Sequence, residues 1–193
     1  MSSVSESGPQ PELERAAPRK RRGRLMLIFA AATLLTVGVD LATKVLAVNN
    51  LDPGSPVKIA GGAVYFTLIR NSGAAFGMGT DFTLALAILA IVVVTGIVTY
   101  AWFRLGSFGW SIALGLVSGG ALGNLVDRIF RAPSVMRGEV VDFISLFHPY
   151  GKGWAIFNVA DSCLVVGVIL IVAMELFGRS IEGPKVADKK DES

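Results

Sequence analysis

The chain has 193 residues, of which 52% are apolar and only 17% are charged, with a formal net charge of +3. A soluble domain carries about 25% charged residues. That deficit, a mean hydropathy of +0.59 and the crowding of charges into both ends and a few loops exclude an ordinary soluble protein. The single cysteine excludes an internal disulfide, and one cysteine with one histidine excludes a zinc site of the usual four-ligand kind.

The apolar residues are concentrated in four stretches of about 20 to 24 residues, each long enough to cross a bilayer as a helix. The first stretch is too long for the apolar core of a secretory signal peptide, so we interpret it as a retained anchor. The predicted spans are 25–48, 82–103, 110–129 and 154–177, which together form one membrane domain over 25–177. The polar ends, 1–24 and 178–193, are expected to be disordered tails.

Two segments between the spans are long enough to have structure of their own. In segment 49–81, the β-prone runs Val57–Ile59 and Val64–Leu68 lie on either side of Gly61-Gly62, which predicts a hairpin. We therefore expect an all-α membrane protein with a small extracytoplasmic sheet between the first and second helices. Segment 130–153 is rich in proline and glycine and is expected to be irregular.

The third predicted span carries a ridge of small residues. Its glycines recur every four residues, at Gly115, Gly119 and Gly123. Such a ridge lets another helix approach closely, so we interpret it as a packing surface.

Lysine and arginine are unevenly divided between the segments that the spans separate. The two tails and the loop between the second and third spans hold eleven, and the other two segments hold five. Because cytoplasmic segments carry the excess of basic residues, both termini are expected in the cytoplasm of a multi-pass plasma-membrane protein. The basic cluster at 19–24 directly precedes an apolar span, which favours a topology signal over a nucleic-acid site. Membrane lipid is therefore an expected partner and nucleic acid is not.

Polar residues of the spans fall at one membrane face. Counting spans places the end of the first, the end of the third and the beginning of the fourth on the same side, the extracytoplasmic side in this orientation. An ionisable group inside a span costs at least about 2.5–3.5 kcal/mol at the bilayer centre, so one convergent cluster predicts a functional site. Its members are Asp40, Lys44, Asn124, Asp127, Arg128, Asn158 and Asp161, with Asn71 and Asp142 from the two segments on that face.

Several members of the cluster have two readings. Asp40 and Lys44 are four residues apart, so they form a structural ion pair or face a substrate. Asn124 either satisfies loop backbone or contacts substrate. Asn71 begins a small-residue run with Gly73 that forms either a tight turn or an edge for a substrate backbone.

Asp127 and Arg128 are adjacent, so they do not face each other on a helix. Structural support is the favoured role of both residues. Arg128 either extends toward lipid headgroups or binds a loop carbonyl.

Asp142 and Asp161 lack a basic residue at helical spacing. Asp142 lies in an otherwise apolar run, 140–143, and Asp161 follows Asn158 by three residues. Two unpaired carboxylates at one boundary suit shared-proton chemistry, in which one acid stays protonated and the other takes a proton from water. The alternative is two structural acids, each satisfied separately.

Two other functions compete with this reading. An ion or proton carrier would use Asp40, Lys44 and Asp161 as a relay, but a relay needs polar groups through the full span and the opposite halves of the helices are apolar. A membrane peptidase with Ser72 as nucleophile and Lys44 as base is the second alternative.

Five blocks of this sequence resemble the bacterial lipoprotein signal peptidase family, also called signal peptidase II. They cover nearly the whole chain apart from its tails. In chain order they are Asp40-Leu-Ala-Thr-Lys44, Asn71-Ser-Gly-Ala-Ala-Phe76, Gly120-Ala-Leu-Gly-Asn124-Leu-Val-Asp127-Arg128, Val140-Val-Asp142-Phe143 and Phe157-Asn158-Val-Ala-Asp161. Any one block is weak, whereas five in order are specific.

The resemblance implies an aspartic endopeptidase whose catalytic pair is Asp142 and Asp161. It implies removal of the signal peptide from diacylglyceryl-modified prolipoproteins, just before the lipidated cysteine, with no metal or cofactor and with sensitivity to globomycin. We expect a monomer. The positions implied to bind substrate or support the site are Asp40, Lys44, Asn71, Gly73, Asn124, Asp127, Arg128 and Asn158. The chain departs from compact members in a longer N-terminal tail and a longer stretch at 129–139.

Overall fold

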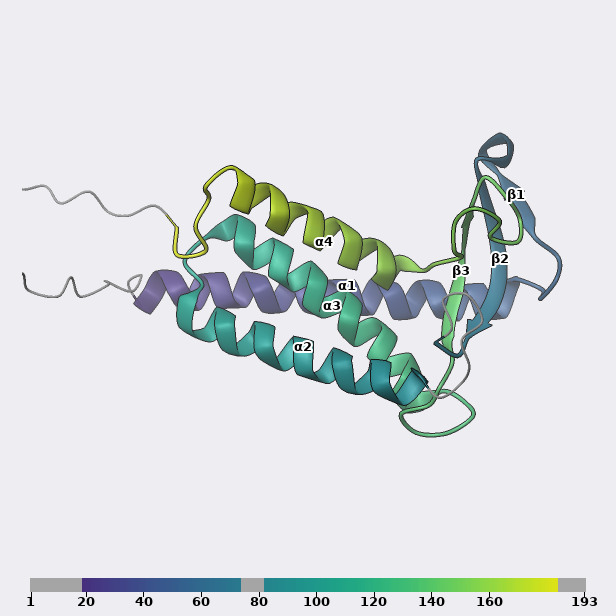
Figure 1. Ribbon diagram of the computed structural model, residues 1–193, viewed down its shortest axis with the longest axis horizontal. Helices are drawn as coiled ribbons and strands as arrows, with labels where there is room; N and C mark the ends of the chain where they lie inside the picture. Colours follow the sequence, from purple (N-terminus) through teal and green to yellow (C-terminus); the bar gives the residue numbers. More distant parts are fainter. Residues whose placement is uncertain (1–18, 74–81, 184–193) are drawn as a thin grey trace, which may run out of the picture.

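The computed structural model describes residues 19–73 and 82–183, and the remaining tail residues and residues 74–81 lie outside the described part. Four helices run through it (Figure 1): α1 (Arg19–Asn50), α2 (Phe82–Arg104), α3 (Phe108–Phe130) and α4 (Val159–Leu176). Each is long and apolar enough to cross a membrane. The prediction of four membrane-spanning helices is therefore confirmed.

Helix α3 is the centre of the bundle and contacts each of the other three helices. Most of its side chains are therefore buried, whereas few of those of α2 and α4 are. Its glycine ridge packs against α1, where a Cβ at Gly119 would lie 2.5 Å from Thr36 Cβ. Gly120 faces α4 instead, and a Cβ there would strike the Ala160 carbonyl. The packing role predicted for the ridge is confirmed.

A three-stranded antiparallel sheet lies across one end of the bundle (Figure 1), in the order β1 (Val57–Ile59), β2 (Val64–Asn71), β3 (Val140–Leu146). The predicted hairpin of β1 and β2 is confirmed. Segment 130–153 was expected to be irregular, but it contains β3, which pairs with both ends of β2 around an irregularity between Phe66 and Ile69. Its register sets Asp142 opposite Ile69.

A short bridge joins β3 to the beginning of α4. Ile144 and Phe157 exchange backbone hydrogen bonds of 2.8 and 2.9 Å, so residues 145–156 form a loop with a closed neck. The apolar residues 154–157 therefore precede the helix, and α4 begins at Val159 rather than at 154. Asn158 caps the helix, and its side chain and that of Asp161 each accept a hydrogen bond from the other's backbone N–H. A capping box of this kind fixes where a helix begins.

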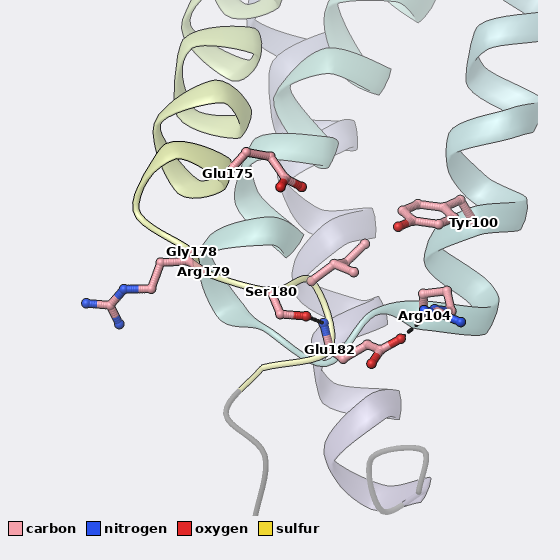
Figure 2. A pocket seen from close by; sticks show the side chains of 8 residues that line it. Tyr100, Arg104, Glu175, Gly178, Arg179, Ser180 and Glu182 are labelled. Atoms are coloured by element: carbon pink, nitrogen blue, oxygen red, sulfur yellow. Dashed lines mark hydrogen bonds and ion pairs between the residues drawn. The ribbon is translucent and has the colours of Figure 1, made fainter. Parts of the chain in front are cut away.

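The end of the bundle opposite the sheet is closed by residues 178–183, which we call the closing segment. Ile181 is buried in the apolar core there, and its carbonyl accepts a hydrogen bond from Gly106 N–H at 2.9 Å. Trp110 Nε1 donates to the Arg179 carbonyl at 2.7 Å. Figure 2 shows the ion pair of Arg104 and Glu182 beside the pocket between α2 and this segment.

The two predicted tails are thus shorter than expected. The closing segment is ordered because one apolar side chain and two backbone carbonyls find partners in the bundle. At the other end, α1 begins at Arg19 and not after residue 24. The expectation of disorder for 1–18 and 184–193 concerns residues outside the described part of the chain.

Candidate functional site

All ten residues singled out from the sequence lie on elements that meet at the sheet end of the bundle. The last turns of α1 and α3, the first turn of α4, the end of β2 with the turn after it, and the middle of β3 meet there. Helix α1 contributes Asp40 and Lys44, and α3 contributes Asn124, Asp127 and Arg128. Asn158 caps α4, and Asp161 lies in its first turn. Asn71 ends β2, Gly73 lies in the turn after it, and Asp142 lies in β3. The block that begins at Asn71 continues into residues 74–76, which lie outside the described part.

A buried ammonium group holds two of the carboxylates. Lys44 Nζ lies 2.7 Å from Asp40 Oδ2 and 2.9 Å from Asp127 Oδ2, and all three residues are at most 1% exposed. Asp40 also accepts a hydrogen bond from Ala160 N–H at 2.9 Å. These contacts join α1 to α3 and α4. The structure therefore favours the structural pair over a substrate-facing role for Asp40 and Lys44.

Asp127 has a second cationic partner that sequence reasoning missed. Arg131, four residues further along the chain, pairs with Asp127 Oδ1, and Val141 N–H of β3 donates to Oδ2 at 3.2 Å. The spacing of four residues was the signal that could have identified Arg131. Asp127 thus ties the end of α3 to the strand that carries Asp142, which is a supporting role.

Asp142 lies in β3 with each oxygen held by an asparagine. Asn158 Nδ2 donates to Oδ1 at 2.6 Å, and Asn71 Nδ2 donates to Oδ2 at 2.9 Å. The residue is only 2% exposed. Burial raises the pKa of Asp142 to about 7, the nearby charge of Asp161 also acts to raise it, and the two amides and Lys44 oppose the rise. An acid with this pKa is about half protonated at pH 7 and largely protonated at lower pH.

Asp161 is part-exposed, whereas Asp142 is buried. Oδ1 of Asp161 accepts a hydrogen bond from Asn124 Nδ2 at 2.7 Å, and its Oδ2 accepts from Asn158 N–H at 3.2 Å. Asn124 and Asn158 are themselves joined, because Asn158 Nδ2 donates to Asn124 Oδ1 at 3.1 Å. Three side-chain hydrogen bonds in sequence therefore connect Asp161 to Asp142.

The turn after β2 explains the glycine at 73. Gly73 N–H donates to Asn71 Oδ1 at 2.9 Å, which closes a tight turn and leaves the Asn71 amide nitrogen facing Asp142. The backbone of Gly73 has φ +104°, a left-handed conformation that favours glycine. The tight-turn reading of this run is supported, and the turn itself orients one of the site's amides.

Arg128 is half-buried and points toward the carboxylates. Its Nη1 donates to the Asn124 carbonyl at 3.2 Å, and its charge interacts with those of Asp161, Asp142 and Asp127. Within the described part of the chain, its buried Nε has no hydrogen-bond partner. This donor is therefore available to a group that enters the site.

The described residues contain no group of three histidine, cysteine or acidic side chains that could hold a metal ion. The chemistry open to the residues present is that of two neighbouring carboxylates. One of them is buried with a raised pKa, the other is part-exposed, and a guanidinium is nearby. Groups matched in this way suit the transfer of protons to and from water.

The fold and the site define a multi-pass membrane protein with a carboxylate pair at one end of its bundle. A family model described as signal peptidase (SPase) II matches residues 32–177. The chain therefore belongs to the signal peptidase II family, and it is a protease.

Curated relatives and solved structures agree with this family. The lipoprotein signal peptidase of Mycolicibacterium smegmatis is 51% identical over 169 residues, which cover 86% of this chain and 67% of that protein. That of Mycobacterium avium is 43% identical over 187 residues, covering 96% of this chain and 98% of the relative. A solved structure described as a bacterial membrane enzyme is similar with a TM-score of 0.65 at 30% identity, covering 86% of this chain and 95% of that one.

Proposed function

We propose that this protein removes the signal peptide from diacylglyceryl-modified prolipoproteins, cleaving just before the lipidated cysteine by an aspartic mechanism. The observation that carries the proposal is the pair Asp142 and Asp161, which are linked through Asn158 and Asn124. The relatives' name, lipoprotein signal peptidase, supports the substrate class.

In the proposed reaction, Asp161 is the general base and Asp142 the proton donor. Asp161 takes a proton from a water molecule, and the water oxygen attacks the carbonyl carbon of the scissile bond. Asp142, whose pKa is raised by burial to about 7, donates to the carbonyl oxygen from its protonated form. The tetrahedral intermediate then breaks its C–N bond. Asp161 passes the proton that it took from water to the leaving nitrogen, and Asp142 takes its proton back from the hydroxyl group as the new carboxyl group forms. The part-exposed position of Asp161 supports its role as the acid that meets water.

The site is proposed to lie at the extracytoplasmic face, with both termini in the cytoplasm. The excess of lysine and arginine in the segments at the opposite end of the bundle supports this orientation. A lipidated precursor has its acyl chains in the outer leaflet and its signal helix across the bilayer, so both reach the sheet end of the bundle by lateral diffusion.

The two other functions considered from the sequence have less support. A proton relay needs polar groups through the bundle, whereas the end opposite the sheet is filled by an apolar cluster that includes Phe29, Leu105 and Trp110. A serine–lysine pair needs Lys44 to face Ser72. Lys44 Nζ instead forms ion pairs with Asp40 and Asp127 and donates a hydrogen bond to Asn124.

The substrate class is tested with two precursors that differ only in the lipid. We expect purified enzyme in detergent to convert a prolipoprotein whose cysteine carries diacylglycerol and to leave the same precursor with a free cysteine uncut. Mass spectrometry of the products gives the cleaved bond. Equal cleavage of both precursors would contradict the substrate class, and cleavage at another bond would contradict the proposed position.

The proposed mechanism also predicts a pH dependence. We expect kcat/KM to fall as the pH rises through about 7, because Asp142 then loses the proton that it donates. Asn71→Ala removes a donor that lowers the pKa of Asp142, so in this variant the alkaline limb of the pH profile should move to higher pH. A profile that is flat between about pH 5 and pH 9 would contradict the assigned role of Asp142.

A further inference from the structure

The asparagines around the two carboxylates are each held in one orientation. In every case the amide oxygen accepts a hydrogen bond from a group that can only donate, so the amide nitrogen must face the other way. These donors are the Gly73 backbone N–H for Asn71, the Asp161 backbone N–H for Asn158, and the Lys44 ammonium for Asn124. Two of the three donors are local backbone groups, whereas the third comes from another helix.

Asn124 is the amide whose orientation depends on that distant charge. Its Oδ1 accepts from Lys44 Nζ at 3.0 Å and from Asn158 Nδ2 at 3.1 Å. With both acceptor sites of Oδ1 in use, its Nδ2 is directed at Asp161 Oδ1, 2.7 Å away. If the amide were reversed, an oxygen would face the Asp161 carboxylate and repel it.

Lys44 is itself fixed in place. It is fully buried on α1, and its ammonium group is held between Asp40 of the same helix and Asp127 of α3. It also donates a hydrogen bond to Asn124. The ion pairs therefore do more than join helices, because they set the position from which Lys44 reaches Asn124.

We propose that Lys44 is a positioning residue of the reaction, which acts through Asn124 to hold Asp161 in the orientation of a general base. This inference rests on the proposed function of Asp161. The ion pairs of Lys44 with Asp40 and Asp127 would by themselves indicate a structural role. The inference gives Lys44 a specific effect on the chemical step as well.

The electrostatics of the site are consistent with this role. Asp142 on β3 is faced by charged groups from three helices: Asp161 of α4, Arg128 of α3 and Lys44 of α1. The positive charge of Lys44 lowers the pKa of Asp142, against the larger effect of burial. Loss of this charge should therefore raise the pKa of Asp142 and move the alkaline limb of the pH profile upward.

The test uses a variant that removes the ammonium group without leaving a net buried charge. Asp40→Asn with Lys44→Met removes one charge of each sign, and Asp127 keeps Arg131 and Val141 N–H as partners. The paired change is made in the full-length protein and again in an Asn124→Ala background. The readouts are kcat and KM on a diacylglyceryl-modified precursor, together with thermal unfolding in detergent. The matched control, Arg104→Met with Glu182→Gln, removes an ion pair at the opposite end of the bundle.

We expect the paired change to lower kcat by about 10- to 100-fold with little change in KM, the usual effect of removing a residue that orients a functional group. In the Asn124→Ala background the same change should have an effect of about twofold or less, because the contact through which Lys44 acts is already gone. The control should leave kcat unchanged. Equal losses in both backgrounds would show that Lys44 supports the fold only, and would overturn the inference.

A second variant keeps the inference testable if the paired change does not fold. Asn124→Asp preserves an oxygen for Lys44 but replaces the N–H that faces Asp161, so we expect the protein to fold and kcat to fall by about 100-fold or more. Near-normal kcat in this variant would overturn the inference. Activity in Asp161→Asn would instead contradict the proposed catalytic pair, so the two failures are distinguishable.

Discussion

We expect Asp142→Asn and Asp161→Asn each to lower kcat on a lipidated precursor by about 10³-fold or more, since members of one catalytic unit are individually indispensable. The amide introduced by Asp161→Asn cannot take a proton from water, and the amide introduced by Asp142→Asn cannot deliver the proton that the carboxyl group holds. The fold should survive both changes. Asp142→Asn adds no charge to this buried position, although its amide nitrogen then meets Nδ2 of Asn71 or Asn158 and one hydrogen bond is lost. Asp161→Asn keeps a side-chain oxygen that can accept from Asn158 N–H.

The measurement is conversion of purified precursor by each purified variant, with thermal unfolding in detergent as the check of folding. Ser72→Ala is the comparison, because it removes the hydroxyl on which a serine–lysine mechanism depends. We expect Ser72→Ala to retain activity. Substantial cleavage by either asparagine variant would remove the basis for a two-carboxylate mechanism, and loss of activity only in Ser72→Ala would favour the serine nucleophile.

The second large effect is expected on stability. Lys44→Met should lower the free energy of unfolding by about 3–5 kcal/mol, the usual cost of removing one partner of a buried ion pair. The change leaves Asp40 without its cation in a fully buried position, while Asp127 still has Arg131. Unfolding by heat or denaturant in detergent micelles measures the loss.

Two variants separate this cause from general damage. Asp40→Asn in addition to Lys44→Met should recover most of the lost stability, because the unpaired charge is then absent. Arg104→Met breaks the pair with Glu182, whose side chain is 38% exposed, and should cost about 1 kcal/mol or less. A Lys44→Met protein as stable as the unchanged one would mean that water reaches Asp40, contrary to its burial.

The helices and the first two strands could be predicted because their signals are local. Long apolar runs specify the spans, and two β-prone runs around Gly61-Gly62 specify the hairpin. The third strand was missed because Val140–Leu146 lies among prolines and glycines that favour a loop. Its pairing with β2 is a long-range contact, and only that contact identifies it as a strand.

The membership of the site was also predictable, whereas its internal connections were not. Polar residues in apolar spans are costly to expose to lipid and therefore cluster. Counting the spans predicted that Asp40, Asn124 and Asp161 lie at one membrane face. Which oxygen meets which donor depends on the packing of α1, α3 and α4, since Lys44 reaches Asp127 and Asn124 across a helix interface. The order of the closing segment likewise depends on Trp110, far away in the chain.

The bridge between Ile144 and Phe157 separates the site from a loop whose length can differ between members of the family. The two acids of the pair lie on either side of it, Asp142 before and Asp161 after, so the distance between them is set by the bridge and by Asn158. The intervening loop leaves and returns at the same point. Natural insertions or deletions around Tyr150 can therefore alter what the protein presents outside the membrane without displacing Asp142 or Asp161.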